Sequence, residues 1–193
     1  MELYFEDYEG DYSDLNKCYI MKISRIDLCR HTMQVGYKNR SLFLSASLYK
    51  HLELFFMVMA NVNCNAGNLM LKDEYHSLDQ SEKVCISYQI GQGLTKAIAE
   101  RYLKVPWVAH VKTMKNMRYQ FEHGGVIKKI INENEQSGTE PDLIGFDIKC
   151  RAHLFESKGS FLESMSSKTI QKAINQVSNY KYFIDPYGNK QLF

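Results

Sequence analysis

The sequence predicts a mixed fold, α/β in the broad sense and of the α+β kind, in which strands and helices both contribute to the core. Runs rich in strand-forming residues occur at residues 105–111, 143–149 and 152–155. Apolar residues recur at helical spacing over residues 47–62, 91–103 and 167–183. With 193 residues, 45% of them hydrophobic, the chain can bury one core, so we expect one compact unit.

The N-terminal part, residues 1–88, is predicted to be an elaboration containing both strands and helices. Residues 18–26 are strand-like, and a second strand is expected around residues 34–37. An apolar stripe at helical spacing predicts an amphipathic helix over residues 47–62, with the stripe facing the core.

The C-terminal part, residues 89–193, is predicted to begin with a helix over residues 91–103. Strands are expected at residues 105–111 and 118–122, before the two runs that form a hairpin. The last helix, residues 167–183, is expected to bury the apolar side chains Ile170, Ala173, Ile174 and Val177.

The most informative residues flank the predicted hairpin. Pro141-Asp142 precedes its first apolar run, and Glu156-Ser157-Lys158 follows its second. If the runs pair antiparallel with a turn near Lys149, Asp142 and Glu156 lie almost opposite each other, with Cβ atoms about 4.5–5.5 Å apart. Glu156 and Lys158 then share one face, because side chains alternate along a strand. Two carboxylates and an ammonium suit a divalent cation and an oriented water.

A third motif lies downstream, where Gln176 and Tyr180 form a QxxxY string. Together the three motifs resemble the PD-(D/E)xK nuclease superfamily, and QxxxY resembles its RecB-type and lambda-exonuclease-type branches. The resemblance covers about residues 91–183. It implies a restriction-endonuclease-like core, with a central mixed sheet flanked by helices, in residues 89–193.

The same resemblance implies further structure after the QxxxY helix, usually a strand and often another helix. Only thirteen residues follow Tyr180. We therefore expect a minimal fold at this end, an N-terminal region that fills the gap, or a chain that is a fragment of a larger protein.

The resemblance also implies roles for the hairpin residues. Asp142 and Glu156 would bind Mg²⁺ or Mn²⁺, with the carbonyl of Ser157 as a third protein ligand. Lys158 would orient the attacking water or stabilise the negative charge that develops on the phosphate.

Two helices are expected to complete the site. Gln176 and Tyr180 would position Lys158, the water or the nucleic-acid backbone. Many superfamily members place an additional acidic residue on a helix before the sheet, and Glu100 is the candidate for this catalytic and metal-binding role. Alternatively, Glu100 is a surface residue that pairs with Lys96 or Lys104 one turn away.

One stretch of the chain is markedly basic, although the net charge is only +2. Residues 104–129 hold six basic residues against one acidic residue, and we expect this stretch to contact a phosphate backbone. The candidate nucleic-acid-binding residues are Lys104, Lys112, Lys115, Arg118, Lys128, Lys129 and, on the last helix, Lys172. The alternative is an ordinary solvated surface. The acidic opening of the chain, residues 1–16, would imitate phosphates, shield a basic groove, or simply be solvated.

Two other groups near the hairpin are given no catalytic role. Asp147 and Lys149 form a DxK string, but no Pro-Asp precedes it at a strand's distance and it lies at the predicted turn. His153 is predicted to lie on the face opposite Glu156.

The remaining features concern the cellular setting. Five cysteines, an odd number without a CxxC pair, favour a reduced, cytoplasmic protein. The apolar runs are too short for a membrane span, and no signal peptide is apparent. A homo-oligomer or a larger assembly is compatible with the sequence.

We therefore expect a Mg²⁺-dependent deoxyribonuclease, acting in restriction, repair, recombination or defence. The sequence does not distinguish endonuclease from exonuclease action, or DNA from RNA. The alternatives are a catalytically silent nucleic-acid-binding or assembly module of the same fold, and an unrelated α+β binding protein with chance motifs.

Overall fold

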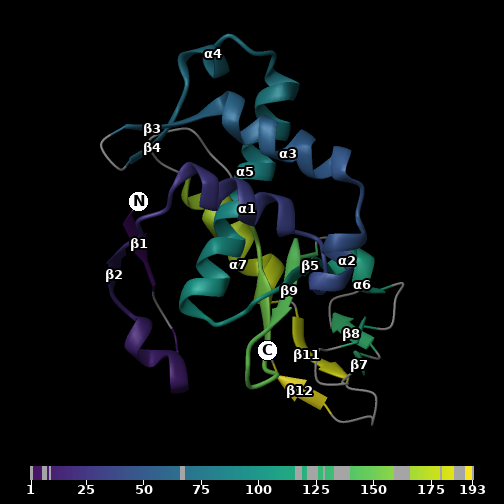
Figure 1. Ribbon diagram of the computed structural model, residues 1–193. Coiled ribbons are helices and arrows are strands. Elements are labelled where there is room, and N and C mark those ends of the chain that lie inside the picture. The colour runs from purple at the N-terminus through teal and green to yellow at the C-terminus, as the bar shows by residue number, and fades with distance from the viewer. Residues whose placement is uncertain are drawn as a thin grey trace.

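The computed structural model of the chain describes residues 2–5, 8, 10–65, 68–115, 119–120, 126–127, 129–132, 140–158, 166–178, 180–184 and 190–192. Within these residues, helices combine with several small antiparallel sheets in an α+β arrangement (Figure 1). The helices are α1 (Arg25–Gln34), α2 (Arg40–Ser45), α3 (Leu48–Asn61), α4 (Asp73–His76), α5 (Gln80–Tyr102), α6 (Val111–Lys115), α7 (Ser167–Ser178) and the 3₁₀ helix η1 (Gly10–Leu15). The strands are β1 (Glu2–Tyr4), β2 (Cys18–Ile20), β3 (Val62–Asn65), β4 (Asn68–Leu71), β5 (Val108–His110), β6 (Tyr119–Gln120), β7 (Val126–Ile127), β8 (Lys129–Asn132), β9 (Leu143–Phe146), β10 (Ala152–Phe155), β11 (Tyr180–Ile184) and β12 (Lys190–Leu192).

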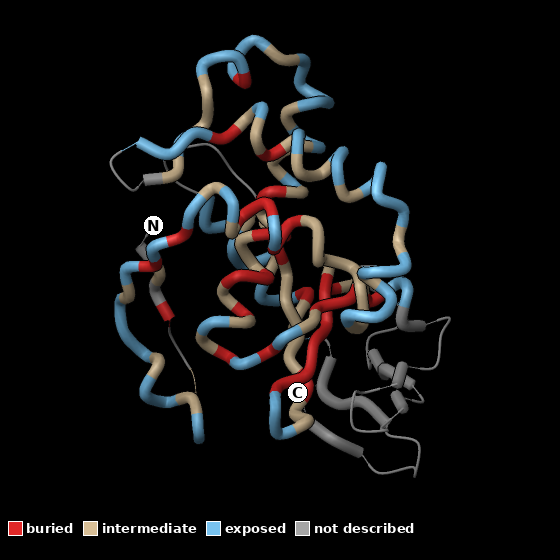
Figure 2. The backbone as a smooth tube through the Cα atoms, in the orientation of Figure 1, coloured by how far each residue is buried: buried red, intermediate tan, exposed pale blue. Residues whose placement is uncertain are grey.

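Helices α1, α3 and α5 pack against one another around one part of the core (Figure 2). Helix α1 begins after Ser24, whose hydroxyl oxygen accepts a 3.0 Å hydrogen bond from the amide of Asp27. Such a cap stabilises a helix by about 1 kcal/mol. Leu28 of α1, Val58 of α3 and Ala97 of α5 are buried in the same cluster.

Helix α5 is the longest element among the described residues and connects the two expected parts of the chain. Asp79 and Glu82 form a capping box, in which each side chain accepts a backbone N–H of the first turn. Because of this cap, α5 begins at Gln80 rather than near residue 91. It passes without a break through the boundary expected between residues 88 and 89.

The central sheet has the strand order β10-β9-β5, and both pairings are antiparallel. All four residues of β9 are buried. A Cβ atom at Gly145 would lie 2.4 Å from Val105 Cγ1 and 2.6 Å from the carbonyl oxygen of Trp107, so glycine allows β9 to approach this segment closely. Leu143 packs with Leu103, which follows α5, so the sheet is fixed against the C-terminal end of this helix.

The N-terminal half differs from the expected order of elements. Of the strand predicted at residues 18–26, only Cys18–Ile20 forms a strand, and α1 begins at Arg25. The strand expected around residues 34–37 is absent from this fully described segment, because α1 continues to Gln34. The Ser24 cap and the burial of the apolar face of α1 outweigh the strand-forming residues at its start.

The C-terminal half differs at its last helix. Helix α7 ends at Ser178, and Tyr180–Ile184 forms β11, which pairs antiparallel with β8 and β12. Gln176 is therefore helical, whereas Tyr180 begins a strand, so the expected helix over residues 167–183 is wrong beyond Ser178. The sequence YKYFI is rich in aromatic and β-branched residues, which explains the strand.

Sheet type is a further difference. Every strand pairing among the described residues is antiparallel, so the mixed sheet that the family resemblance implies is not seen in this part of the chain. Strand β5 is also shorter than the predicted 105–111, because α6 begins at Val111.

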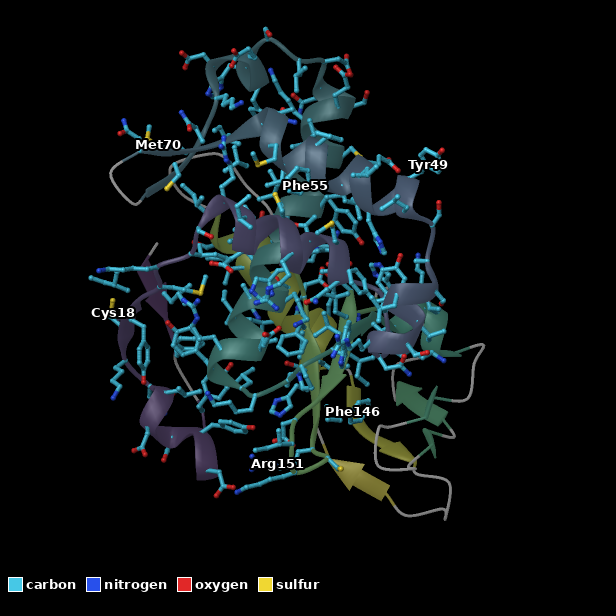
Figure 3. All side chains as sticks on the ribbon, in the orientation of Figure 1. Cys18, Tyr49, Phe55, Met70, Phe146 and Arg151 are labelled. Carbon is cyan, nitrogen blue, oxygen red and sulfur yellow. The ribbon has the colours of Figure 1, made fainter. Side chains whose placement is uncertain are left out.

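Two apolar stripes expected to be buried are partly exposed. On α3, Phe55 packs against the core, whereas Phe56 is exposed and Tyr49 points away from it (Figure 3). On α7, Ile170 and Ile174 are half-exposed, and Gln176 is the buried residue. Helical periodicity identifies an apolar face but does not determine how much of that face the neighbouring elements cover.

Across the described part of the chain, none of the helices combines the length and the apolar character that crossing a membrane requires. All five cysteines belong to the described residues, and all five are free thiols.

Candidate active site

Strands β9 and β10 pair in the register expected from the sequence. Leu143 lies opposite Phe155, and one more step along the hairpin brings Asp142 opposite Glu156. Two hydrogen bonds join the strand ends there. The amide of Asp142 donates to Glu156 Oε2 at 3.1 Å, and the amide of Ser157 donates to Asp142 Oδ2 at 3.1 Å. Each carboxylate is thus held against the opposite strand end by a backbone N–H, and both lie at the open end of the hairpin.

Lys158 completes this group. Its ammonium forms an ion pair with Oε1 of Glu156, whose side chain is only 3% exposed. Lys158 itself is partly exposed, so the pair lies at the border between the core and solvent. All three residues follow the end of β10, and the ion pair brings Glu156 and Lys158 together while Ser157 between them is buried.

Helix α7 reaches the same end of the hairpin through Gln176. Its Nε2 donates a 3.1 Å hydrogen bond to the carbonyl oxygen of Glu140, two residues before Asp142. Gln176 is 8% exposed, and its Oε1 has no hydrogen-bond partner among the described residues. Tyr180 begins β11, and its side chain lies outside the described residues.

Glu100 lies elsewhere, in a cluster between α1 and α5. Its carboxylate pairs with Arg30 at 3.2 Å, lies 3.7 Å from His31 Nδ1, and forms an ion pair with Lys96, whose side chain is fully buried. Burial pushes the pKa of Glu100 upward, but the Lys96 hydrogen bond and charge outweigh burial, and the pKa lies below its usual value. These contacts match the alternative in which Glu100 pairs with Lys96.

The charges of the hairpin carboxylates act on a residue in a different part of α5, Tyr88. Burial raises the pKa of Tyr88, and the charges of Asp142 and Glu156 raise it further, while the neighbouring Gln92 lowers it. Burial also lowers the pKa of His110, against the opposing effect of Asp142. The capping box at residues 79–82 is the signal that would have extended the predicted helix to include Tyr88.

The basic residues are only partly described. Lys104, Lys112 and Lys172 are exposed. Lys104 has a left-handed backbone (φ 57°), and its ammonium donates a hydrogen bond to the carbonyl oxygen of Arg101. For Lys115 on α6 and Lys129 on β8, the structure describes the backbone alone. Arg118 and Lys128 lie outside the described residues.

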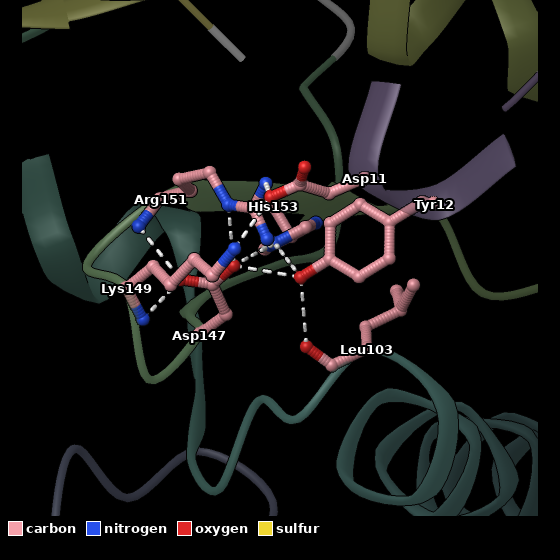
Figure 4. Close-up of polar contacts among 7 residues, drawn as sticks. All are labelled: Asp11, Tyr12, Leu103, Asp147, Lys149, Arg151 and His153. Carbon is pink, nitrogen blue, oxygen red and sulfur yellow. Dashed lines mark hydrogen bonds and ion pairs between the residues drawn. The ribbon is translucent and has the colours of Figure 1, made fainter. Parts of the chain in front are cut away.

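A second polar cluster occupies the turn of the hairpin, centred on Asp147 (Figure 4). Oδ1 of Asp147 accepts hydrogen bonds from the backbone amides of Lys149 and Arg151, at 2.8 and 2.9 Å. Oδ2 accepts the Tyr12 hydroxyl and Arg151 Nε, both at 2.7 Å, and lies 3.4 Å from His153 Nε2. Five protein groups contact its two oxygens, so this cluster holds the turn of the hairpin against η1.

The donor atoms at the hairpin suit a hard divalent cation. Among the described residues, no three His, Cys, Asp or Glu side chains gather closely enough to hold a metal ion by themselves. Mg²⁺ is usually bound by one or two carboxylates, with waters and substrate phosphates completing the octahedron. Asp142 and Glu156 supply that number of carboxylates.

We compared the chain with protein-family models, with curated proteins and with solved structures, and none of them matched.

Proposed function

We propose that this chain is a metal-dependent nuclease of the PD-(D/E)xK type that hydrolyses phosphodiester bonds, with DNA as its substrate. The observation that carries the proposal is the pair of hydrogen bonds that hold the Asp142 and Glu156 carboxylates across the open end of the hairpin, with Lys158 paired to Glu156. Two further observations support it. Gln176 of the QxxxY motif bonds the Glu140 carbonyl, two residues before Asp142, and Asp142 and Glu156 both lie at the open end of the hairpin.

In this function, Asp142 and Glu156 would hold Mg²⁺ or Mn²⁺, with the Ser157 carbonyl as a further ligand. The bound ion would lower the pKa of a water and neutralise charge on the phosphate. The backbone N–H groups that hold the two carboxylates orient them before substrate arrives, which lowers the reorganisation needed at the reacting phosphate.

Hydrolysis adds one water across the phosphodiester. The water oxygen bonds to phosphorus, the bond from phosphorus to the leaving oxygen breaks, and one proton of the water ends on that oxygen. Lys158 orients the water or stabilises the charge on the phosphate. Gln176 holds the segment before Asp142 through its bond to the Glu140 carbonyl.

The test is incubation with supercoiled and linear DNA in the presence of Mg²⁺, Mn²⁺ or EDTA. We expect cleavage with either metal and none with EDTA. Asp142→Asn and Glu156→Gln should abolish cleavage, and Lys158→Ala should lose most turnover while retaining metal binding. The exposed pair Lys50–Glu53 provides matched controls, because Lys50→Ala and Glu53→Gln remove the same charges on α3. Equal cleavage by Glu156→Gln and Glu53→Gln would exclude the proposed metal site.

The alternative is a silent nucleic-acid-binding module in a reduced, cytoplasmic setting. The pairing of Lys158 with Glu156 favours it, because the ammonium neutralises a buried carboxylate without a metal. DNA binding that is unchanged by EDTA, with no cleavage in either metal, would support this alternative.

A further inference from the structure

Four aromatic rings from separate parts of the chain gather where α2 lies beside the start of β5 (Figure 1). This aromatic cluster consists of Tyr37, Phe43, His51 and Trp107. The ring centroid of Phe43 lies 5.6 Å from that of Tyr37 and 4.4 Å from that of His51. The Trp107 ring lies 6.3 Å from Phe43. Each of the four residues is partly exposed, so solvent reaches the outer side of the cluster.

The cluster is fixed to the central sheet from two sides. The amide of Gly36, next to Tyr37, donates a 3.0 Å hydrogen bond to the carbonyl oxygen of Val108 in β5. Gly36 has a φ of +88°, and a Cβ atom there would lie 3.1 Å from the His110 ring, so glycine permits this approach. On the inner side, the fully buried ammonium of Lys96 lies 6.0 Å from the centroid of the Trp107 ring.

The backbone segments that carry these rings are basic. Residues 36–46 and 104–115 contain five basic residues and no Asp or Glu: Lys38, Arg40, Lys104, Lys112 and Lys115. Proteins that bind single-stranded nucleic acid combine aromatic rings, on which bases stack, with cations that follow the phosphates. An apolar peptide would need the rings but not this charge. Charge complementarity therefore favours a nucleotide as the occupant.

One ring of the cluster has an unused polar atom. The Nε2 atom of His51 is buried and has no hydrogen-bond partner among the described residues. Buried polar groups nearly always have a partner, so this nitrogen calls for one that the described side chains do not supply. The edge of a base carries both donors and acceptors, so a base entering the cluster can satisfy this nitrogen in either tautomer.

Strand β5 connects the cluster to the proposed metal site. Trp107 comes directly before β5, and Val111 comes directly after it. The amide of Val111 donates a 3.1 Å hydrogen bond to the carbonyl oxygen of Asp142. Four residues of strand span about 14 Å, which is about four nucleotides at the spacing of one strand of duplex DNA. This separation is short enough for one DNA strand to reach both places.

We propose that the aromatic cluster is a stacking site for an unpaired base, and that the substrate class of the Asp142–Glu156 site is single-stranded DNA, including the unpaired end of a duplex. The role in substrate choice rests on the proposed nuclease function. Base binding itself requires no metal, so it can be measured separately from cleavage.

The first experiment uses Trp107, which is the only tryptophan of the chain. Titrating the wild-type protein with a short oligothymidylate in EDTA should quench the indole fluorescence, because a base stacks in the cluster. An abasic oligonucleotide of the same length carries the same phosphates but no base, and should not quench it. Equal quenching by the two oligonucleotides would overturn the inference, because phosphate charge alone would then explain binding.

The second experiment removes one flat ring. Phe43→Leu keeps an apolar side chain and should weaken oligothymidylate binding about 10-fold to 100-fold, the effect of losing one stacked base. Phe43→Tyr retains the ring and should retain binding. Phe56→Leu is the matched control, because Phe56 on α3 is 61% exposed and lies outside the cluster. Equal affinity of the Phe43→Leu and Phe56→Leu proteins for oligothymidylate would overturn the stacking role.

Closed circular duplex DNA tests the proposed preference for unpaired bases. Its bases are already paired and stacked, so Phe43→Leu should change its binding much less than that of oligothymidylate. An equal loss for both DNAs would overturn the single-strand preference.

The outcomes for the wild-type protein separate this inference from the proposed function. Metal-dependent cleavage of DNA without quenching by oligothymidylate would reject the stacking site and leave the nuclease proposal intact. Base-dependent quenching without cleavage in either metal would support the stacking site and reject the nuclease proposal. A protein that shows neither would reject both.

Discussion

The hydroxyl of Tyr12 donates a 2.7 Å hydrogen bond to Oδ2 of Asp147, which lies 135 residues later in the chain. The same hydroxyl lies 3.1 Å from the carbonyl oxygen of Leu103, just after α5. Arg151, which also bonds Asp147, lies over the Tyr12 ring at 4.5 Å (Figure 4). One phenol therefore joins η1, the end of α5 and the turn of the proposed catalytic hairpin.

Removing this hydroxyl should destabilise the protein without touching the proposed site. Tyr12→Phe should lower the free energy of unfolding by about 1–3 kcal/mol, because Asp147 loses a donor in a buried position. Urea denaturation measures this change, with Tyr49→Phe as the control. Loss of less than about 0.5 kcal/mol would show that the phenol contributes mainly through its ring.

The same cluster should make stability sensitive to acid. Burial pushes the pKa of Asp147 upward, but hydrogen bonds from Tyr12 and Arg151 outweigh burial and bring it to about 2. Because the pKa in the unfolded chain is higher, near 3.8, this stabilisation is complete above about pH 4 and is lost as the pH falls to about 2. The loss should be about 2 kcal/mol.

Denaturation of the wild type and of Asp147→Asn at a series of pH values tests this expectation. The variant should be less stable at pH 6, and the difference between the two proteins should shrink between pH 4 and pH 2. Parallel curves over that range would assign the acid sensitivity to other carboxyl groups.

Glu100→Gln should affect stability more than metal binding. The Lys96 side chain is fully buried, and removing its carboxylate partner leaves a buried ammonium poorly compensated. We expect a loss of about 3 kcal/mol, at the low end for a broken buried pair because Glu100 is partly exposed. Metal titration by calorimetry should give the wild-type affinity. A large loss of metal affinity at unchanged stability would instead support the expected role of Glu100 as a metal ligand.

Gln176→Ala should lower cleavage by about 10-fold to 100-fold, the range typical of residues that support a metal ligand without binding the metal. The reason is that its Nε2 holds the carbonyl of Glu140, close to Asp142. Gln171→Ala on the same helix is the matched control, because Gln171 is exposed and bonds Asn175. Equal rates for the two variants would remove Gln176 from the site.

Neutralising the basic stretch should weaken DNA binding and reduce its dependence on salt. If Lys112, Lys115 and Arg118 each contact one phosphate, changing all three to alanine should reduce the slope of log K against log[salt] by about 2.7 for duplex DNA. Changing three exposed lysines of the N-terminal half, Lys17, Lys22 and Lys50, is the control. An unchanged slope in the first variant would mean that this stretch is ordinary surface.

The hairpin was predictable from the sequence because its determinants are local. Two apolar runs separated by a short polar segment specify an antiparallel pair, and the register places Asp142 opposite Glu156 without reference to the rest of the chain. The helical conformation of α3 and of the C-terminal half of α5 was predictable for a similar reason, because it follows from the spacing of nearby apolar residues. Capping signals at Ser24 and Asp79 were also present in the sequence, and using them would have located α1 and the start of α5.

Other features depend on which elements meet in space. A helical wheel places Glu100 beside an apolar stripe, but only the packing of α1 against α5 brings Lys96, Arg30 and His31 to it. Periodicity likewise places Gln176 on α7 without indicating that it would be buried. The sequence by itself determined the two facing carboxylates and the lysine beside them. Tertiary structure decided that Gln176 bonds the Glu140 carbonyl before Asp142 and that Tyr12 bonds Asp147, because long-range packing sets both contacts.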